Sequence, residues 1–225
     1  QIRNSVCYQN ANVKIIGAHG GITVGEDGAT HQALEDISLM SNIPNMSVIV
    51  PADYAETYAA VKYAANHNGP FYIRVPRASL PDVFKDGVEL SPKAKIINEG
   101  KDVTVVTNGE TLQECIDAAV ELDKRGISVE LIHLPFVKPF DKDTVISSAS
   151  KTGLVVTVEN HSIIGGLGSA VCEELSNKYP TKVYRIGIND EFGQSGKAEE
   201  LLEYYGLDSK GLVKRLQAIY INEKG

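Results

Sequence analysis

Short apolar runs alternate along the chain with longer segments in which apolar residues recur every three or four positions. The short runs are rich in β-branched residues and lack polar alternation, which is typical of strands buried on both faces of a parallel sheet. The longer segments have the periodicity of amphipathic helices. The pattern therefore predicts an α/β protein with mostly parallel sheets between layers of helices.

The first eighty residues contain few of these elements. The predicted strands are 13–16, 46–50 and 71–75. The predicted helices are 30–40, with Thr30 as its N-cap, and 53–66, which opens on the D-x-x-E pair Asp53 and Glu56. Three strands are too few for a complete doubly wound domain. Residues 1–80 are therefore expected to be the C-terminal part of a domain that is truncated at its N-terminus.

The pattern breaks between residues 81 and 100, where prolines and glycines are mixed with charges, and we predict a linker there. The alternation then restarts, with 134–136 interpreted as a connection. The predicted strands are 103–107, 128–133, 154–159 and 182–186, and the predicted helices are 111–125, 141–151, 168–178, 197–205 and 209–221. Residues 101–225 are therefore expected to form a second doubly wound α/β domain.

Composition excludes several classes of function. Lys and Arg number 22 against 29 Asp and Glu, a net charge of −7, which disfavours binding to nucleic acid. The three cysteines, Cys7, Cys115 and Cys172, are far apart and show no metal-binding spacing, so we expect reduced thiols, no metal site and a cytoplasmic protein. No apolar run approaches the ~20 residues that span a bilayer, so no membrane partner is predicted.

The segment from residue 18 to residue 32 has the highest density of reactive side chains. It combines His19 and His31 with Glu26, Asp27 and four glycines. Asp27 and His31 would lie at the mouth of the predicted helix, where an anion is favoured and an imidazole can exchange a proton near neutral pH. The alternative is a glycine-rich loop that only caps the helix. The concentration of ionisable groups favours a functional site.

Two further segments carry candidate chemistry. Arg77 follows a predicted buried strand and could bind a phosphate or carboxylate at the strand's carboxyl end, whereas Arg74 lies inside the strand and is interpreted as a structural ion-pair partner. The glycine-rich segment 159–169 links a strand to a helix but matches neither phosphate-binding pattern. We interpret it as a tight turn with close helix packing, and place His161 at a subunit interface.

The motif Gly25-Glu26-Asp27-Gly28-x-Thr30-His31-Gln32, with His19 eight residues before Asp27, resembles the signature of the transketolases. Other matching segments are 43–47, 50–53, 69–70, 165–169 and 190–196, so the resemblance covers nearly the whole chain. The chain is most similar to the C-terminal subunit of split transketolases. In these enzymes a separate chain carries the diphosphate-binding domain.

The resemblance implies a thiamine diphosphate-dependent transferase of the pentose phosphate pathway. Such an enzyme passes a two-carbon ketol unit from a ketose phosphate to an aldose phosphate. By similarity, Asp27 would bind a donor hydroxyl and His31 would assist proton transfer near the reactive carbon. His19 and Arg77 would hold the sugar phosphate, and Glu26 would face the cofactor.

The resemblance also implies that much of the active site lies outside these residues. The family's glutamate and its pocket for the pyrimidine ring would precede Gln1, so we expect Gln1 to be a truncation rather than a natural start. The diphosphate and Mg²⁺ would be held by an N-terminal transketolase subunit or domain. The chain is therefore expected to be inactive alone and to act in a homodimer or heterotetramer.

Three other hypotheses remain. A 1-deoxyxylulose 5-phosphate synthase is one, although the equivalent loop of that family usually lacks the Glu of Gly25-Glu26-Asp27. A β subunit of a 2-oxoacid dehydrogenase is another, which the paired histidines disfavour. The last is a non-catalytic assembly module that serves only in dimerisation.

Overall fold

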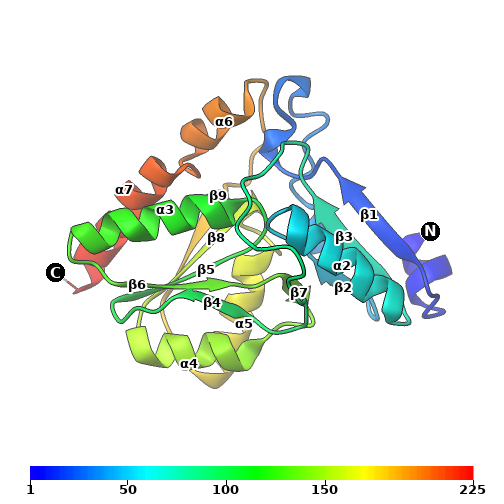
Figure 1. Cartoon of the computed structure of the whole chain (residues 1–225), viewed down its shortest axis with the longest axis horizontal. Helices are drawn as coiled ribbons and strands as arrows, with labels where there is room; N and C mark the ends of the chain where they lie inside the picture. The colour runs from blue at the N-terminus through cyan, green and yellow to red at the C-terminus, as the bar shows by residue number, and fades with distance from the viewer. Residues whose placement is uncertain (225) are drawn as a thin grey trace.

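The computed structural model describes residues 1–224 and contains two α/β units, each built around its own sheet (Figure 1). The first sheet has the strand order β1-β3-β2-β7. Its strands are β1 (Lys14–Ala18), β2 (Ser47–Ile49), β3 (Phe71–Val75) and β7 (Phe136–Lys138). Strands β1 and β2 run parallel to β3, whereas β7 pairs antiparallel with β2.

The helices of the first unit are α1 (Asp36–Ser41) and α2 (Tyr54–Asn66), with the short helices η1 (Ile2–Cys7) and η2 (Ile22–Asp27). Alternate residues of the sheet enter different core clusters. Ile49 and Ile73 pack with the alanines of α2, whereas Val48 and Tyr72 pack with Ile37 of α1. The two helices therefore cover opposite faces of the sheet, as the unbroken apolar strands predict.

The second sheet has the order β4-β6-β5-β8-β9, in which only the edge strand β4 is antiparallel to its neighbour. Its strands are β4 (Lys95–Asn98), β5 (Val103–Thr107), β6 (Val129–His133), β8 (Val155–Ser162) and β9 (Val183–Ile188). Its helices are α3 (Thr111–Lys124), α4 (Lys142–Thr152), α5 (Leu167–Lys178), α6 (Ala198–Tyr205) and α7 (Ser209–Lys224).

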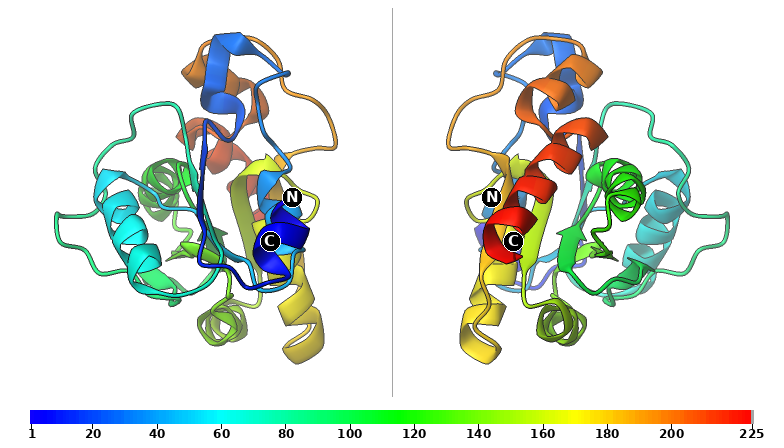
Figure 2. Two further views of the ribbon diagram at one scale, coloured as in Figure 1. Left: turned by 90° about the vertical axis from the view of Figure 1, so that its right-hand side faces the viewer. Right: turned by 90° about the vertical axis from the view of Figure 1, so that its left-hand side faces the viewer.

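Helices cover both faces of this second sheet. Helices α3 and α7 lie on one face and α4 and α5 on the other (Figures 1 and 2). Val105 packs in the cluster that includes α3 and α7, and its neighbour Val106 packs with α4 and α5. The predicted fold class, α/β with two mostly parallel sheets between helices, is confirmed.

Two strands lie where the sequence indicated none. Residues 136–138, interpreted as part of a connection, form β7 and extend the sheet of the first unit, with Val50 N donating to Pro135 O at 2.8 Å. Residues 95–98, inside the predicted linker, form β4 at the edge of the second sheet. Both strands are short, and their pairing depends on partners distant in sequence, so local pattern does not reveal them.

The helix predicted over 30–40 is shorter than expected. It begins at Asp36, and Thr30 is not its N-cap. The preceding backbone is bonded elsewhere, because Ala33 O accepts from Gly21 N at 2.9 Å and Leu34 O accepts from Ser162 N at 2.9 Å. The segment before α1 is therefore a turn followed by bonds to both units, rather than the first turn of a helix.

Helix α2 begins as predicted. Asp53 caps it by accepting from Glu56 N at 2.8 Å, and its second oxygen accepts from Val83 N and Phe84 N. One carboxylate therefore holds both the helix start and the segment that leaves the first unit. None of the helices between residues 1 and 224 is long and apolar enough to cross a membrane.

Candidate functional site

Two of the predicted site residues follow neighbouring parallel strands. Strand β1 ends at Ala18, which pairs with Val75 at the end of β3. His19 is the next residue and has a φ of 63°, a left-handed conformation uncommon for a residue with a side chain. Gly20 N donates to Val75 O at 3.3 Å, and Arg77 lies two residues beyond Val75. His19 and Arg77 therefore lie at the same edge of the sheet, where parallel α/β sheets carry their sites.

The structure brings Asp27 to Arg77. Arg77 Nη1 lies 2.7 Å from Asp27 Oδ2 and also donates to Val24 O at 2.8 Å. Both side chains are close to half exposed, at 43% and 48%, so their ion pair is worth at most about 1 kcal/mol. An incoming anion or polyol can therefore compete for either partner at low cost.

His31 and Glu26 are exposed and lie in the same loop as Asp27. His31 N donates to Gly28 O at 3.0 Å, and its ring Nδ1 lies 3.0 Å from Thr30 Oγ1. The bridge between Gly20 and Ala33 brings the segment after His31 alongside the segment after His19. Glu26 is in η2 next to Asp27 and also faces solvent. All five predicted site residues thus come from two loops that meet at one edge of the first sheet.

Arg74, interpreted from the sequence as a structural ion-pair partner, is buried inside β3. Its Nε lies 3.1 Å from Asp36 Oδ2, and its Nη2 donates to Asn160 O at 2.8 Å. Tyr72 donates to the same Asp36 at 2.7 Å, and burial beside this carboxylate raises the pKa of the tyrosine. The structural interpretation of Arg74 is confirmed.

The glycine-rich segment 159–169 is a structural turn. Glu159 accepts from Leu167 N at 2.7 Å and from Gly168 N at 2.8 Å, so the chain's own carboxylate occupies the N-terminus of α5. Burial raises the pKa of Glu159 to about 7. The predicted tight turn is found, and the amides that could have bound a phosphate are already paired.

His161 does not lie at a subunit interface. Its ring is fully enclosed within this chain, so no surface remains for contact with another subunit. Its Nδ1 lies 2.7 Å from Ser162 O, and burial lowers the pKa of the imidazole to about 4.

Sequence reasoning missed three polar residues behind the two loops. Gln32 appeared only as the last letter of the motif, Asn160 only as a member of the 159–169 segment, and Glu110 was not singled out. In the structure Gln32 and Asn160 are buried and Glu110 is partly buried. All three bond to the segment that carries Asp27, by contacts described below.

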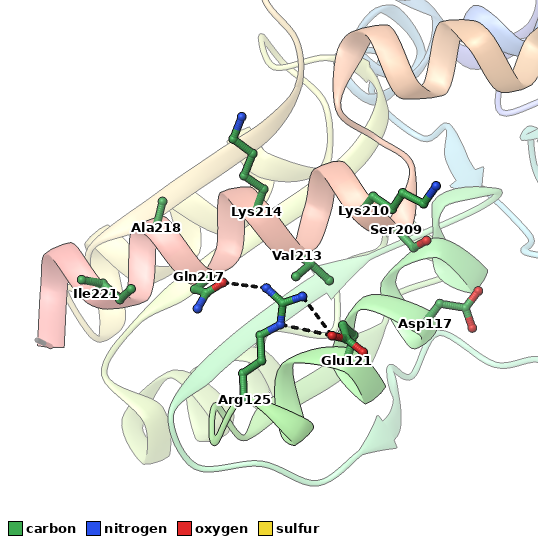
Figure 3. A pocket seen from close by; sticks show the side chains of 10 residues that line it. All are labelled: Asp117, Glu121, Arg125, Ser209, Lys210, Val213, Lys214, Gln217, Ala218 and Ile221. Carbon is green, nitrogen blue, oxygen red and sulfur yellow. Dashed lines mark hydrogen bonds and ion pairs between the residues drawn. The ribbon is translucent and has the colours of Figure 1, made fainter.

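A surface groove of about 670 Å³ lies elsewhere, between α3 and α7 (Figure 3). Arg125 projects into it and is held by Glu121 at 2.9 Å and by Gln217 at 2.9 Å. Within the groove, Arg125 is thus already paired with Glu121. Its lining contains none of the residues at the ends of β1 and β3.

The residues present do not form a complete site for thiamine diphosphate and a metal. Within residues 1–224, no three His, Cys, Asp or Glu side chains are grouped so that they could hold a metal ion. The glycine-rich helix start that could have received a diphosphate is occupied by Glu159. The loops around Asp27 offer contacts to a polyol phosphate, but no cradle for a diphosphate.

The fold and the two loops define an α/β protein whose strand ends carry histidines, an aspartate and an arginine. Comparison with known families shows to which family this protein belongs. The family model for the transketolase pyrimidine binding domain matches residues 1–83, and that for the transketolase C-terminal domain matches residues 92–212. The chain belongs to the transketolase family, as the sequence motifs indicated.

Individual relatives of this chain belong to the same family. The chain is 47% identical to a putative transketolase C-terminal section of Methanocaldococcus jannaschii, over 96% of this chain and 68% of that protein. It is 42% identical to a 6-deoxy-6-sulfo-D-fructose transketolase subunit of Clostridium sp., over 95% of this chain and 67% of that protein. A solved split gene transketolase, described as an inactive beta4 tetramer, superposes on this chain with a TM-score of 0.87 at 44% sequence identity. The superposition covers 96% of this chain and 69% of the solved one.

Proposed function

We propose that this chain is the C-terminal component of a thiamine diphosphate-dependent transketolase that moves a two-carbon ketol unit from a ketose phosphate to an aldose phosphate. The observation that carries the proposal is the meeting of His19, Arg77, Asp27 and His31 at one edge of the first sheet, in a chain of this family. In this proposal residues 1–80 belong to the pyrimidine-binding domain, 81–100 to the linker, and 101–225 to the C-terminal domain.

The four side chains match the chemistry of a phosphorylated sugar. Asp27 can accept a hydrogen bond from a donor hydroxyl, a contact that would select the configuration of the carbon bearing that hydroxyl. His31 is exposed and can exchange a proton with a hydroxyl near the reactive carbon. Arg77 and His19 supply N–H donors for the phosphate, and Arg77 keeps its bond to Val24 O while it releases Asp27.

The cofactor supplies the nucleophilic carbon that receives the ketol unit. In the proposal a partner N-terminal subunit holds its diphosphate and Mg²⁺, and Glu26 approaches it from this chain. The tetramer named for the solved split gene transketolase supports an oligomeric assembly, and we propose a homodimer or heterotetramer as the active form. We further propose that the complex acts in cytoplasmic carbohydrate metabolism, as in the pentose phosphate pathway.

The test is reconstitution of the natural polypeptide that carries these residues with its N-terminal partner. Two-carbon transfer is measured from xylulose 5-phosphate and from 6-deoxy-6-sulfo-D-fructose to an aldose phosphate, with and without thiamine diphosphate. We expect cofactor-dependent transfer with at least one donor, and none from this component alone. The His31→Ala variant should lose about 10²-fold in rate, as expected for a positioned acid–base group.

The matched control is His67→Ala, because His67 is an exposed histidine in the turn after α2 and stacks only on Tyr63. This variant should keep full activity. Unchanged activity of His31→Ala would contradict the catalytic role and favour an assembly module. Product formed only from pyruvate and glyceraldehyde 3-phosphate would favour a 1-deoxyxylulose 5-phosphate synthase.

A further inference from the structure

Residues 22–31, here called the η2 loop, carry Asp27 and His31 but are anchored on the second unit. At the start of the loop, Ile22 N donates to Asn160 Oδ1 at 3.0 Å, and Thr23 Oγ1 donates to Glu110 Oε2 at 2.6 Å. Asn160 Nδ2 donates to the other oxygen of Glu110 at 2.6 Å. Both oxygens of one buried carboxylate are therefore used to hold the loop's first residues.

The end of the loop is anchored by Gln32, which directly follows His31. Its side chain is 6% exposed, and its Nε2 donates to Ile22 O at 3.1 Å and to Gln194 O at 3.0 Å. The amide thus joins the start of the η2 loop to the 190–196 segment of the second unit. Gly193 lies against it so closely that a Cβ there would collide with Gln32 Oε1.

The η2 loop depends on these contacts because its glycines allow its backbone to adopt many conformations. Gly25 and Gly28 have φ values of 80° and 75°, a region open to glycine at no cost. A Cβ on Gly28 would collide with Ser195 Oγ of the second unit, so the two segments pack in direct contact. Helix α6, which follows this segment, packs against η2, as Figures 1 and 2 show at one end of the molecule.

We propose that the second unit serves as the template that sets the positions of Asp27 and His31, with Gln32 and Glu110 as the positioning residues. The proposal rests on the function proposed above for Asp27 and His31. Both positioning residues bond to groups of the protein itself: the polar hydrogens of the Gln32 amide face main-chain carbonyls, and the Glu110 carboxylate accepts from Asn160 and Thr23.

The charge environment of Glu110 fits this role. Burial raises the pKa of its carboxyl, and Arg74 opposes the rise. A neutral amide of the same shape can therefore replace it, because the Thr23 hydroxyl can turn from donor to acceptor. Glu110→Gln should keep the loop in place, whereas Glu110→Ala should release it.

The sharpest variant is Gln32→Glu, which keeps the volume but replaces a donor by a carboxylate facing two carbonyl oxygens. In the reconstituted enzyme we expect kcat/KM for the ketose donor to fall roughly tenfold to 10²-fold, since small misplacements of reacting groups have such effects. Thiamine diphosphate affinity should not change. Gln9→Glu, an exposed substitution of the same type, is the matched control and should behave as wild type.

Amide hydrogen exchange of residues 22–31, measured on the full-length chain, gives a readout independent of activity. Exchange should accelerate in Gln32→Glu and Glu110→Ala and return to the wild-type rate in Glu110→Gln. Thr23→Val, which removes one donor at nearly constant volume, tests the same anchor should the other variants fail to fold. Unchanged exchange and unchanged kcat/KM in folded Gln32→Glu and Thr23→Val would overturn the proposal.

The measurements distinguish a failure of the proposed function from a failure of the positioning role. An inactive wild-type enzyme with accelerated exchange in the variants would refute the proposed function while supporting the anchoring of the loop. An active wild-type enzyme with variants of equal kcat/KM would refute the positioning role alone.

Discussion

At the scale of single residues, Arg77 is the side chain whose role most depends on what is bound. It donates through one nitrogen to Asp27 and to Val24 O, and nearly half of its side chain is exposed. A guanidinium presents several N–H groups in a plane and can bind a phosphate with two parallel bonds, which an ammonium cannot.

We therefore predict that Arg77→Lys raises KM for a phosphorylated ketose about tenfold while kcat changes little. Steady-state kinetics of the reconstituted enzyme with a phosphorylated and an unphosphorylated ketose would measure this. The second donor is the control, since it has no phosphate to lose contact with. Equal effects on both donors would contradict phosphate binding and leave Arg77 as a support for Asp27.

Sequence reasoning identified the charged residues of the candidate site, but not the residues whose hydrogen bonds anchor the η2 loop. His19, Asp27, His31 and Arg77 stand out because ionisable side chains gather in glycine-rich loops. Gln32 carries no charge, and its significance comes from contact with Gln194, 162 positions further along the chain. A single sequence contains no local signal for such a contact.

At the scale of elements, the strands that the apolar runs predicted lie within two residues of their observed bounds, except that β8 ends at Ser162 rather than at residue 159. Strand β3 and strand β5 were placed at their observed bounds, 71–75 and 103–107. The bounds of strand β7 and of helix α1 were not predicted, because hydrogen bonds to residues distant in sequence determine where both elements lie. The start of α5 also depends on a residue outside the helix, and this dependence can be tested by mutation.

Glu159 caps α5 from eight residues upstream, and we predict that Glu159→Ala lowers the free energy of unfolding by about 2 kcal/mol because two buried amides lose their acceptor. Glu159→Gln should also destabilise the fold, since the amide keeps one acceptor oxygen but sets its NH2 group against the second backbone N–H. Urea unfolding at pH 7 would measure both. Glu173→Ala, an exposed change on the same helix, is the control, and an equal loss there would contradict the capping role.

At the scale of the whole molecule, the two units are joined by a buried ion pair. Glu56 of α2 lies 2.6 Å from His133 at the end of β6 and 2.7 Å from Lys95 of β4, and both Glu56 and His133 are fully buried. Because three elements of different units meet at one carboxylate, its charge state controls how firmly the first sheet is held against the second.

Burial alone would raise the pKa of Glu56, but His133 and Lys95 outweigh it and lower the pKa to about 2 from its usual 4.5. A carboxyl whose pKa is lower in the folded state than in the unfolded state stabilises the fold above the unfolded value, and this stabilisation is lost as pH falls through the folded value. The stability of the chain should therefore decline between pH 4.5 and about 2, on the order of 3 kcal/mol from this group.

The predicted measurement is urea unfolding from pH 6 to pH 2.5 for the wild-type chain and for Glu56→Gln. The variant should be less stable than wild type at pH 6, and its stability should change less over the acidic range, so that the two curves converge as pH falls. Glu121→Gln is the control, because Glu121 is an exposed partner of Lys124 and Arg125 within one helix. Parallel curves for wild type and Glu56→Gln would show that the pair does not tie the two units together.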